Sequence, residues 1–210
     1  MRKYRLYLFD FDGTLVDTSK ALRMVFKESY RQFDRDVTDE DCVRFSREPL
    51  NHSFQSLGLD MSRFWDFVDV INFYLNSDES VALSYAYDDL MSSHKFIKDI
   101  GAMYGIVTSN NIPHVKEILN HIHFPSDEVD VYVGNQEAPN PKPDPMSINK
   151  ALEMLHYQGK ISDVVYIGDS LNDCKAAENA GIETYLLDRH HEYKDVPYRI
   201  IYSLEELIIR

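Results

Sequence analysis

The sequence predicts an α/β protein in which a parallel β-sheet is interrupted by an inserted helical module. Short apolar runs rich in β-forming residues recur along the chain, and the stretches between them are long enough for helical crossovers. One long stretch after the first run instead has its apolar residues only at helical spacing. Because strands that alternate with helices are typical of parallel sheets, the helical stretch is interpreted as an insertion into that pattern.

Five segments are expected to form the strands of the sheet. They are residues 6–9, 104–108, 129–133, 164–167 and 184–187. The first is a continuous apolar run that stops at Asp10, as a buried parallel strand does where it reaches a loop.

Several helix ends are indicated between and after these strands. Pro113 marks the start of the helix after the second strand, and Gly181 is the expected stop of the helix before the last strand. Near the C-terminus, Ser203 and Glu206 have the spacing of a capping box, which predicts the start of a final helix.

Residues 18–87 form the predicted insertion. Apolar residues recur there at helical spacing, as in Leu22, Val25 and Phe26, and again in Phe64, Trp65, Val68, Ile71 and Leu75. The α/β core domain is then discontinuous and consists of residues 1–17 and 88–210. Because the insertion follows the first strand directly, we expect it to lie over the carboxyl ends of the strands as a lid.

The composition is that of a folded, acidic protein. With 44% hydrophobic and 12% aromatic residues, the 210 residues suffice for an apolar core. The net charge of −13 disfavours binding to nucleic acids or anionic membranes, whereas a small phosphorylated metabolite needs only a local positive site. Cys42 and Cys174 lack metal-type spacing, and no signal-peptide-like or membrane-spanning run is seen, which predicts a cytoplasmic protein. We expect a monomer or a homodimer.

Two carboxylates, those of Asp10 and Asp12, follow the first strand with one residue between them. They can converge once the chain leaves the strand, and Gly13 allows a sharp turn there. One carboxylate could then attack a phosphorus atom while the other carries a proton. The alternative is a polar turn that closes a strand, because turns attract Asp.

A second polar group follows the strand at 104–108. The hydroxyl of Thr108, with the backbone N–H groups of Ser109 and Asn110 after it, could bind a phosphoryl oxygen near the start of a helix. A helix N-cap would explain the same residues.

Lys142 lies in a segment, 139–145, that has proline at every second position. Such a segment forms neither a helix nor a central strand, and it presents Lys142 on a stiff arm. The alternative is an exposed linker with a solvated lysine.

Two further aspartates follow the apolar run at 164–167. Asp169 comes directly after Gly168, and Asp173 falls in the first turn of the next helix, where Asp is favoured in any case. With Asp10, Asp169 would offer hard oxygen ligands suited to Mg²⁺. All of these groups lie at the carboxyl ends of predicted parallel strands, where ligands of open α/β sheets bind.

In the order and spacing of these four motifs the chain resembles the haloacid dehalogenase superfamily, in particular its phosphoglycolate phosphatase-like members with a helical cap after the first motif. The resemblance covers nearly the whole chain. It implies a Rossmann-like core with a parallel sheet and helices on both faces, an all-helical cap domain, and a phosphatase that depends on Mg²⁺ and acts on a small phosphorylated metabolite.

The resemblance also implies roles for individual residues. Asp10 would be the nucleophile that forms an aspartyl-phosphate, and Asp12 would protonate the leaving group and then activate water. The residues placed around the phosphoryl group are Thr108, Lys142, Ser109 and Asn110. The residues placed around Mg²⁺ are Asp10, Asp12 through its backbone carbonyl, Asp169, and Asp173 in support. Because the dehalogenases of the superfamily lack a carboxylate at the place of Asp12, a phosphatase is favoured.

In the cap, Arg47 is expected to bind a distal group of the substrate, with a solvated surface arginine as the alternative. Glu48 beside it would disfavour phosphoglycolate itself, because that substrate carries a second negative group. Two other functions fit part of the pattern. One is a phosphomutase of the β-phosphoglucomutase type, which shares the core; the other is a phospho-accepting or binding module with a relic active site.

Overall fold

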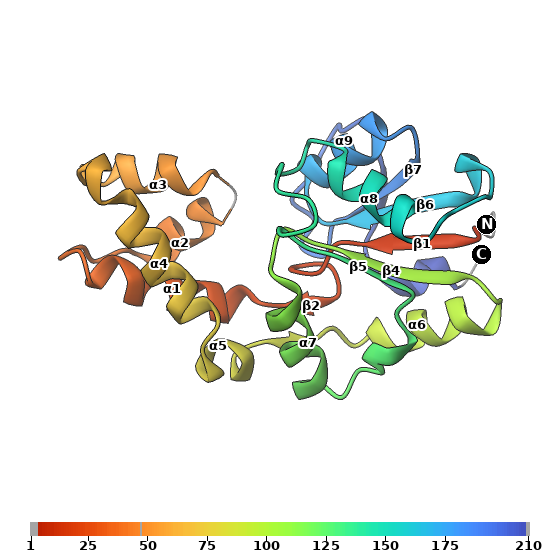
Figure 1. Ribbon diagram of the computed structural model, residues 1–210, viewed down its shortest axis with the longest axis horizontal. Helices are drawn as coiled ribbons and strands as arrows, with labels where there is room; N and C mark the ends of the chain where they lie inside the picture. The colour runs from red at the N-terminus through yellow and green to blue at the C-terminus, as the bar shows by residue number, and fades with distance from the viewer. Residues whose placement is uncertain (1–3, 47, 209–210) are drawn as a thin grey trace. The chain divides into compact units, whose positions relative to one another are not determined.

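The computed structural model describes residues 4–46 and 48–208, and the chain divides into two units (Figure 1). Unit 1 combines Met1–Asp17 with Ala86–Arg210, and unit 2 is Thr18–Tyr85. Unit 1 therefore contains the sheet, and unit 2 is the inserted helical segment. The action of unit 2 as a lid stays a prediction.

Unit 1 is built on a six-stranded parallel sheet with the strand order β5-β4-β1-β6-β7-β8. The strands are β1 (Leu6–Phe9), β4 (Met103–Val107), β5 (Val131–Val133), β6 (Val164–Gly168), β7 (Glu183–Leu187) and β8 (Arg199–Ile201). The parallel α/β fold and all five predicted strands are confirmed. The short edge strand β8 was not predicted, because three residues give too little alternation to recognise.

Helices cover both faces of this sheet (Figure 1). They are α6 (Leu90–Asp99), α7 (Ile112–His121), α8 (Met146–Met154) and α9 (Leu171–Asn179), with short 3₁₀ helices η2 (Ser126–Glu128) and η3 (Ile161–Asp163). Alternate residues of β1 serve the two faces. Leu6 and Leu8 pack in one core cluster with Ile148 of α8, whereas Phe9 stacks on Tyr104 with ring centroids 4.7 Å apart. The central strand is therefore buried on both sides.

The predicted ends of two helices are confirmed. Asn111 caps α7 by accepting the backbone N–H of His114, and Pro113 lies in the first turn. Gly181 follows the last turn of α9 with φ +74°, the left-handed conformation that favours glycine.

The predicted C-terminal capping box is wrong. The hydroxyl of Ser203 does cap a helix, but it accepts the N–H of Glu205, and the helix is the 3₁₀ helix η4 (Leu204–Leu207). The carboxylate of Glu206 accepts the N–H of Tyr202 instead of that of Ser203. The tighter 3₁₀ geometry moves both partners by one residue relative to the α-helical pattern.

Unit 2 is helical and has its own core. Its helices are α1 (Ser19–Arg31), α2 (Asp39–Phe45), α3 (Leu50–Ser56), the 3₁₀ helix η1 (Met61–Arg63), α4 (Phe64–Leu75) and α5 (Asp78–Ala82). The core is rich in aromatic rings, and Phe67 is fully buried in it. Trp65, one of the apolar residues that recur at helical spacing, is 73% exposed, because the neighbouring face of α4 with Phe67 and Ile71 packs inward.

A two-stranded sheet of β2 (Val16–Asp17) and β3 (Tyr85–Ala86) lies where the chain leaves unit 1 and returns to it. None of the helices within 4–46 and 48–208 has the length and apolar character needed to cross a bilayer.

Candidate active site

Three neighbouring strands deliver polar residues to one edge of the sheet. Asp10 directly follows β1, Thr108 follows β4, and Asp169 follows β6. Because β1 pairs in parallel with both β4 and β6, these residues emerge side by side at the carboxyl ends of the strands. The predicted convergence of three motifs in one region is therefore present.

Lys142 reaches into this region from the proline-rich segment. Its Nζ lies 2.5 Å from Oδ1 of Asp10 and 2.6 Å from Oδ1 of Asp173. It also donates to the hydroxyl of Tyr166 at 2.7 Å and to the backbone carbonyl of Val107 at 3.2 Å. Its side chain is 8% exposed, so the alternative of a solvated linker lysine is wrong.

Tyr166 is a site residue that sequence reasoning missed. Its hydroxyl contacts Lys142 and also lies 3.2 Å from Oδ1 of Asp173. In the sequence Tyr166 is one aromatic residue within the apolar run of β6. A tyrosine that only packs in the core would stand in the same sequence pattern. Only the position of its hydroxyl at the edge of the cluster distinguishes it.

The charge on Lys142 is stabilised by its neighbours. Burial by itself lowers the pKa of a lysine, but the carboxylates of Asp10 and Asp173 together raise the pKa of Lys142 well above its ordinary value. Lys142 is therefore a permanent positive charge at the bottom of the site.

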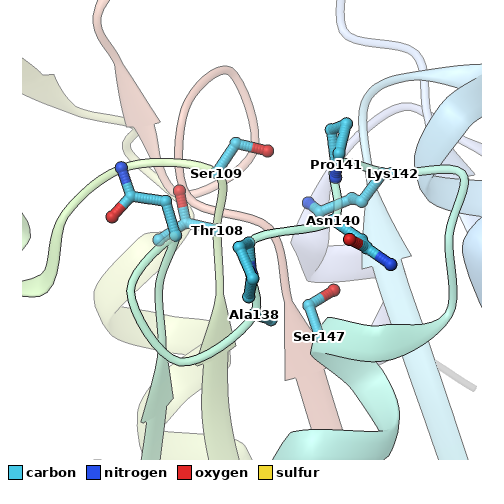
Figure 2. A pocket seen from close by; sticks show the side chains of 9 residues that line it. Thr108, Ser109, Ala138, Asn140, Pro141, Lys142 and Ser147 are labelled. Atoms are coloured by element: carbon cyan, nitrogen blue, oxygen red, sulfur yellow. The ribbon is translucent and has the colours of Figure 1, made fainter.

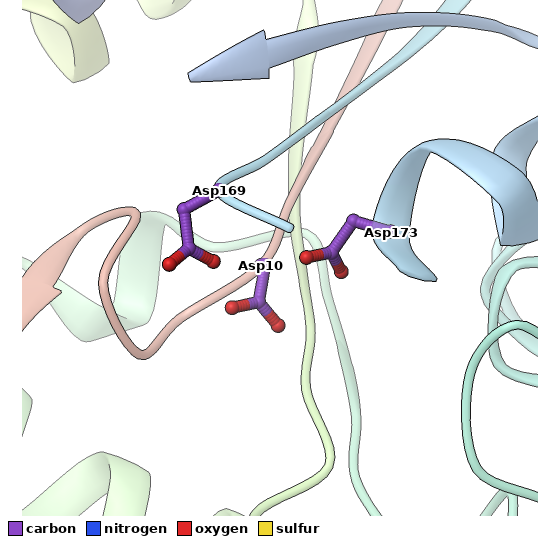
Figure 3. A group of neighbouring side chains, drawn as sticks. All are labelled: Asp10, Asp169 and Asp173. Atoms are coloured by element: carbon purple, nitrogen blue, oxygen red, sulfur yellow. The ribbon is translucent and has the colours of Figure 1, made fainter. Parts of the chain in front are cut away.

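Three carboxylates gather around this lysine. Asp10, Asp169 and Asp173 each place one oxygen within 4.8 Å of the others (Figure 3). Burial raises the pKa of Asp10 well above its ordinary value, and the charges of the neighbouring carboxylates add to this rise. The positive charge of Lys142 opposes the rise but does not cancel it. Burial and the charge of Asp173 raise the pKa of Asp169 to about 7. The negative charge of the cluster is therefore incompletely balanced by the protein itself.

The donor set of this cluster fits a hard divalent cation. One ammonium against three carboxylates leaves a formal surplus of two negative charges. Carboxylate oxygens in a buried cluster of this size are the ligands that Mg²⁺ prefers. Of the predicted metal residues, Asp10, Asp169 and Asp173 share the cluster, whereas the side chain of Asp12 is not part of it.

Asp173 is held by protein donors on both oxygens. Oδ1 accepts from Lys142 and Tyr166, and Oδ2 accepts the backbone N–H and the hydroxyl of Ser170 in a capping box at the start of α9. A Cβ on Gly168 would lie 2.4 Å from Cβ of Asp173, so only glycine lets the helix start this close to the strand. Asp173 therefore lies at the start of a helix and also belongs to the carboxylate cluster.

The loop after β1 is tightly closed. Gly13 has φ +77°, and its N–H donates to the carbonyl of Val16. A Cβ on Gly13 would lie 2.4 Å from Oδ2 of Asp169, so the loop touches the carboxylate cluster. The partly buried Asp12 acts electrostatically on His114 of α7: burial lowers the pKa of that histidine, and the charge of Asp12 opposes the shift.

A cavity of about 70 Å³ opens beside Lys142 and Thr108 (Figure 2). Its lining residues are Thr108, Ser109, Asn135, Ala138, Pro139, Asn140, Pro141, Lys142 and Ser147. The hydroxyl of Thr108 is buried and accepts the backbone N–H of Asn110 at 3.0 Å. Of the predicted phosphoryl-binding residues, Thr108, Ser109 and Lys142 line the cavity, whereas Asn110 is not among its lining residues.

Ser147 is a second residue that sequence reasoning missed. It is 4% exposed, and within the described part of the chain its hydroxyl has no hydrogen-bond partner. Figure 2 shows that hydroxyl directed toward the cavity from the first turn of α8. A serine at a helix start is so common that nothing in the sequence distinguishes this position.

Arg47, the expected cap residue, lies outside the described residues. Glu48 belongs to unit 2, and its effect on substrate choice stays a prediction.

Comparison with known proteins adds a family match. Residues 7–187 match the family model of the haloacid dehalogenase-like hydrolases. This range includes every site residue described above.

Individual relatives cover most of the chain. A phosphoglycolate phosphatase from Vibrio cholerae serotype O1 is 28% identical over 204 residues, which span 88% of this chain and 84% of the relative. The pyrophosphatase PpaX of Listeria monocytogenes serotype 4b is 26% identical over 184 residues, 85% of this chain and 80% of the relative. Among solved structures, a Bacteroides fragilis protein described as a haloacid dehalogenase-like hydrolase superposes with a TM-score of 0.86 at 28% identity, covering 98% of this chain and 100% of its own.

Proposed function

The chain belongs to the haloacid dehalogenase-like hydrolase family, and we propose that it is a Mg²⁺-dependent phosphatase that cleaves a small phosphorylated metabolite through an aspartyl-phosphate on Asp10. The observation that carries this proposal is the contact between Lys142 and Asp10 inside a carboxylate cluster with a surplus of two negative charges. A cation and a phosphoryl group are the two ligands that such a combination accommodates together.

The first chemical step uses both aspartates of the β1 loop. An oxygen of Asp10 attacks phosphorus, and the bond between phosphorus and the leaving oxygen breaks. The carboxyl group of Asp12 donates its proton to that oxygen, so an alcohol leaves and the phosphoryl group stays on Asp10.

The second step regenerates the enzyme. Asp12, now a carboxylate, takes a proton from a water molecule whose oxygen attacks phosphorus, and the bond between phosphorus and Asp10 breaks. The products are inorganic phosphate and an enzyme in its starting protonation state. The same residue therefore serves as acid and then as base.

The remaining residues bind and neutralise the transferring group. Lys142 and the hydroxyl of Thr108 lie beside the cavity and would hold two phosphoryl oxygens, with the N–H of Ser109 as a further donor. Asp10, Asp169 and the backbone carbonyl of Asp12 would hold Mg²⁺, which would supply positive charge beside the phosphoryl oxygens. Asp173 keeps Lys142 in place from the other side.

The substrate is proposed as a class. Relatives with similar identity are named a phosphoglycolate phosphatase and a pyrophosphatase, so the relationship supports hydrolysis of a phosphate ester or anhydride without selecting one molecule. We further propose a cytoplasmic enzyme, which the unpaired, buried thiols of Cys42 and Cys174 support.

A screen of phosphorylated metabolites with Mg²⁺ tests the proposal. The wild type should release inorganic phosphate, chelation of Mg²⁺ should abolish the release, and Asp10→Asn should reduce it to background. Asp127→Asn, on an exposed side chain of η2, is the matched control and should keep full activity. Persistent activity in Asp10→Asn or without metal would contradict the proposal. An isomerised sugar phosphate in place of inorganic phosphate would indicate the phosphomutase, and no turnover of any compound would favour a binding module.

A further inference from the structure

Arg189 binds two separate segments of unit 1, residues 87–89 and the loop at Thr14. It follows β7 by two residues, and its side chain is 11% exposed. Both terminal nitrogens donate to the carboxylate of Asp89 at 2.9 Å, and Nη2 also donates to the backbone carbonyl of Thr14 at 2.8 Å. The guanidinium lies 3.8 Å from the centre of the Tyr87 ring. A planar fork that is stacked and bonded in this way is far more restricted than a surface arginine.

The partner carboxylate is itself fixed. Asp89 also accepts the hydroxyl of Ser203 at 2.8 Å and the backbone N–H of Leu204 at 2.7 Å. Burial raises the pKa of Asp89, but Arg189 and these two donors outweigh burial and lower it below its ordinary value. Arg189 and Asp89 therefore form a buried ion pair in which Oδ2 of Asp89 accepts three hydrogen bonds.

The second segment is the loop that carries Asp12. Thr14 lies two residues after Asp12, and its side chain is fully buried. The loop is closed by hydrogen bonds from Gly13 N–H to Val16 and from Leu15 N–H to the carbonyl of Phe11. Because the loop is short and closed, fixing the carbonyl of Thr14 restricts the whole loop.

We propose that Arg189 is a positioning residue that holds the carboxyl group of Asp12 where it can donate a proton to the leaving oxygen. Arg189 does so from the sheet, through the carbonyl of Thr14, and Asp89 keeps its guanidinium in place. This inference rests on the proposed phosphatase function. No step of the reaction passes through Arg189 itself.

A positioning role for Asp12 predicts a dependence on the leaving group. An alkyl alcohol leaves only with a proton, whereas p-nitrophenolate leaves readily without one. Loss of the hydrogen bond from Arg189 to the carbonyl of Thr14 should therefore slow phosphoenzyme formation from an alkyl phosphate more than from p-nitrophenyl phosphate. General instability of the fold would reduce both activities by the same factor, because it only lowers the amount of active enzyme.

The test compares kcat/KM for p-nitrophenyl phosphate and for the alkyl phosphate that the wild type hydrolyses fastest. In Arg189→Met, kcat/KM for the alkyl phosphate should fall on the order of 10-fold further than kcat/KM for the aryl phosphate. This factor is smaller than the contribution of a complete general acid, because Asp12 is still present but less well positioned. Arg199→Met is the matched control, because Arg199 is an exposed arginine on β8 that lies over Tyr185, and the ratio should stay at the wild-type value. Equal losses for the two substrates in Arg189→Met would overturn the proposal.

Arg189→Lys keeps the test decisive if Arg189→Met does not fold. A lysine retains the charge beside Asp89 but cannot bond Asp89 and Thr14 with the same planar fork. It should shift the ratio in the same direction by a smaller factor, and an unchanged ratio would overturn the inference. Absence of phosphate release from the wild type would instead refute the phosphatase proposal, and this inference with it.

Discussion

Nζ of Lys142 lies 2.5 Å from Oδ1 of Asp10, although 132 positions separate the two residues in the sequence. The contact exists because β1 is the central strand and the proline-rich segment returns to its carboxyl end. It joins the candidate nucleophile to the only positive charge that the described residues place inside the carboxylate cluster. The fold thus gives the site its electrostatic character through this pair.

Lys142→Met should both inactivate and destabilise the protein. The substitution leaves the carboxylates of Asp10 and Asp173 buried without their partner, which costs about 3–5 kcal/mol in typical buried pairs. Urea unfolding in the absence of metal measures the free energy of unfolding. The control is Lys150→Met, at a partly exposed pair with Glu153, which should change it by less than about 1 kcal/mol. Equal stability of the two variants would show that Lys142 does not compensate the buried carboxylates.

Gly13→Ala should reduce kcat/KM more than a glycine substitution elsewhere in unit 1. The new Cβ would lie 2.4 Å from Oδ2 of Asp169, and the residue would also have an unfavourable φ of +77°. Gly101→Ala separates the two effects, because Gly101 has φ +69° but no atom within 4 Å of a Cβ. The control should lose about 1 kcal/mol of stability and keep its activity. Gly13→Ala should in addition lose at least about 10-fold in kcat/KM, since small misplacements of reacting groups are costly. Matching kinetics in both variants would contradict this account.

Asp89 should stabilise the folded protein at neutral pH, and this stabilisation should be lost in acid. Its pKa is lowered in the folded protein from the ordinary 3.8, so the unfolded chain takes up the proton first as the pH falls. The contribution is fully present above about pH 5, declines as the pH drops below the ordinary value, and is gone below the folded-state pKa. Asp89→Asn should lower the melting temperature at pH 7 and show a shallower further decline between pH 5 and pH 3. Parallel curves for variant and wild type would refute a lowered pKa.

His94 should make the protein less stable as the pH falls through the mildly acidic range. Burial lowers its pKa from 6.5, and the positive Lys98 adds to this, while Glu128 and Asp130 oppose it. The unfolded chain therefore binds a proton below about pH 6.5 before the folded protein does, which favours unfolding. His94→Phe retains the ring contact with Tyr104 and removes the titration. Its melting temperature should vary less between pH 7.5 and pH 5.5 than that of the wild type, and an equal or steeper variation would contradict the assignment.

The sequence was sufficient for features that depend on local pattern. The continuous apolar runs located β1 and β6, because strands buried on both faces need no polar residue. Gly181 and Pro113 marked helix ends through backbone constraints that act within a few residues. Local pattern did not decide the exposure of Trp65, because helical spacing indicates a helix at α4 but not which of its faces the neighbouring helices cover.

The aspartates that follow β1 and β6 were also predicted from the chain alone. Their position directly after buried strands indicates a ligand site more than an ordinary turn, since parallel strands end together at one edge of the sheet, where ligands bind. Nothing local distinguished Tyr166 or Ser147, whose neighbours in the sequence are those of an ordinary core strand and an ordinary helix start. Their hydroxyls matter only through groups brought near them by the fold.

The parallel α/β pattern, the helical insertion and the aspartates Asp10, Asp12 and Asp169 can be recognised from the chain alone, because each is encoded within a few neighbouring residues. The burial of Lys142 against Asp10 and the hydrogen bond from Arg189 to the carbonyl of Thr14, 175 positions away, became visible only in the folded protein. Ion pairs and hydrogen bonds form between groups within a few ångströms of each other, and sequence spacing does not specify which distant segments the sheet brings that close.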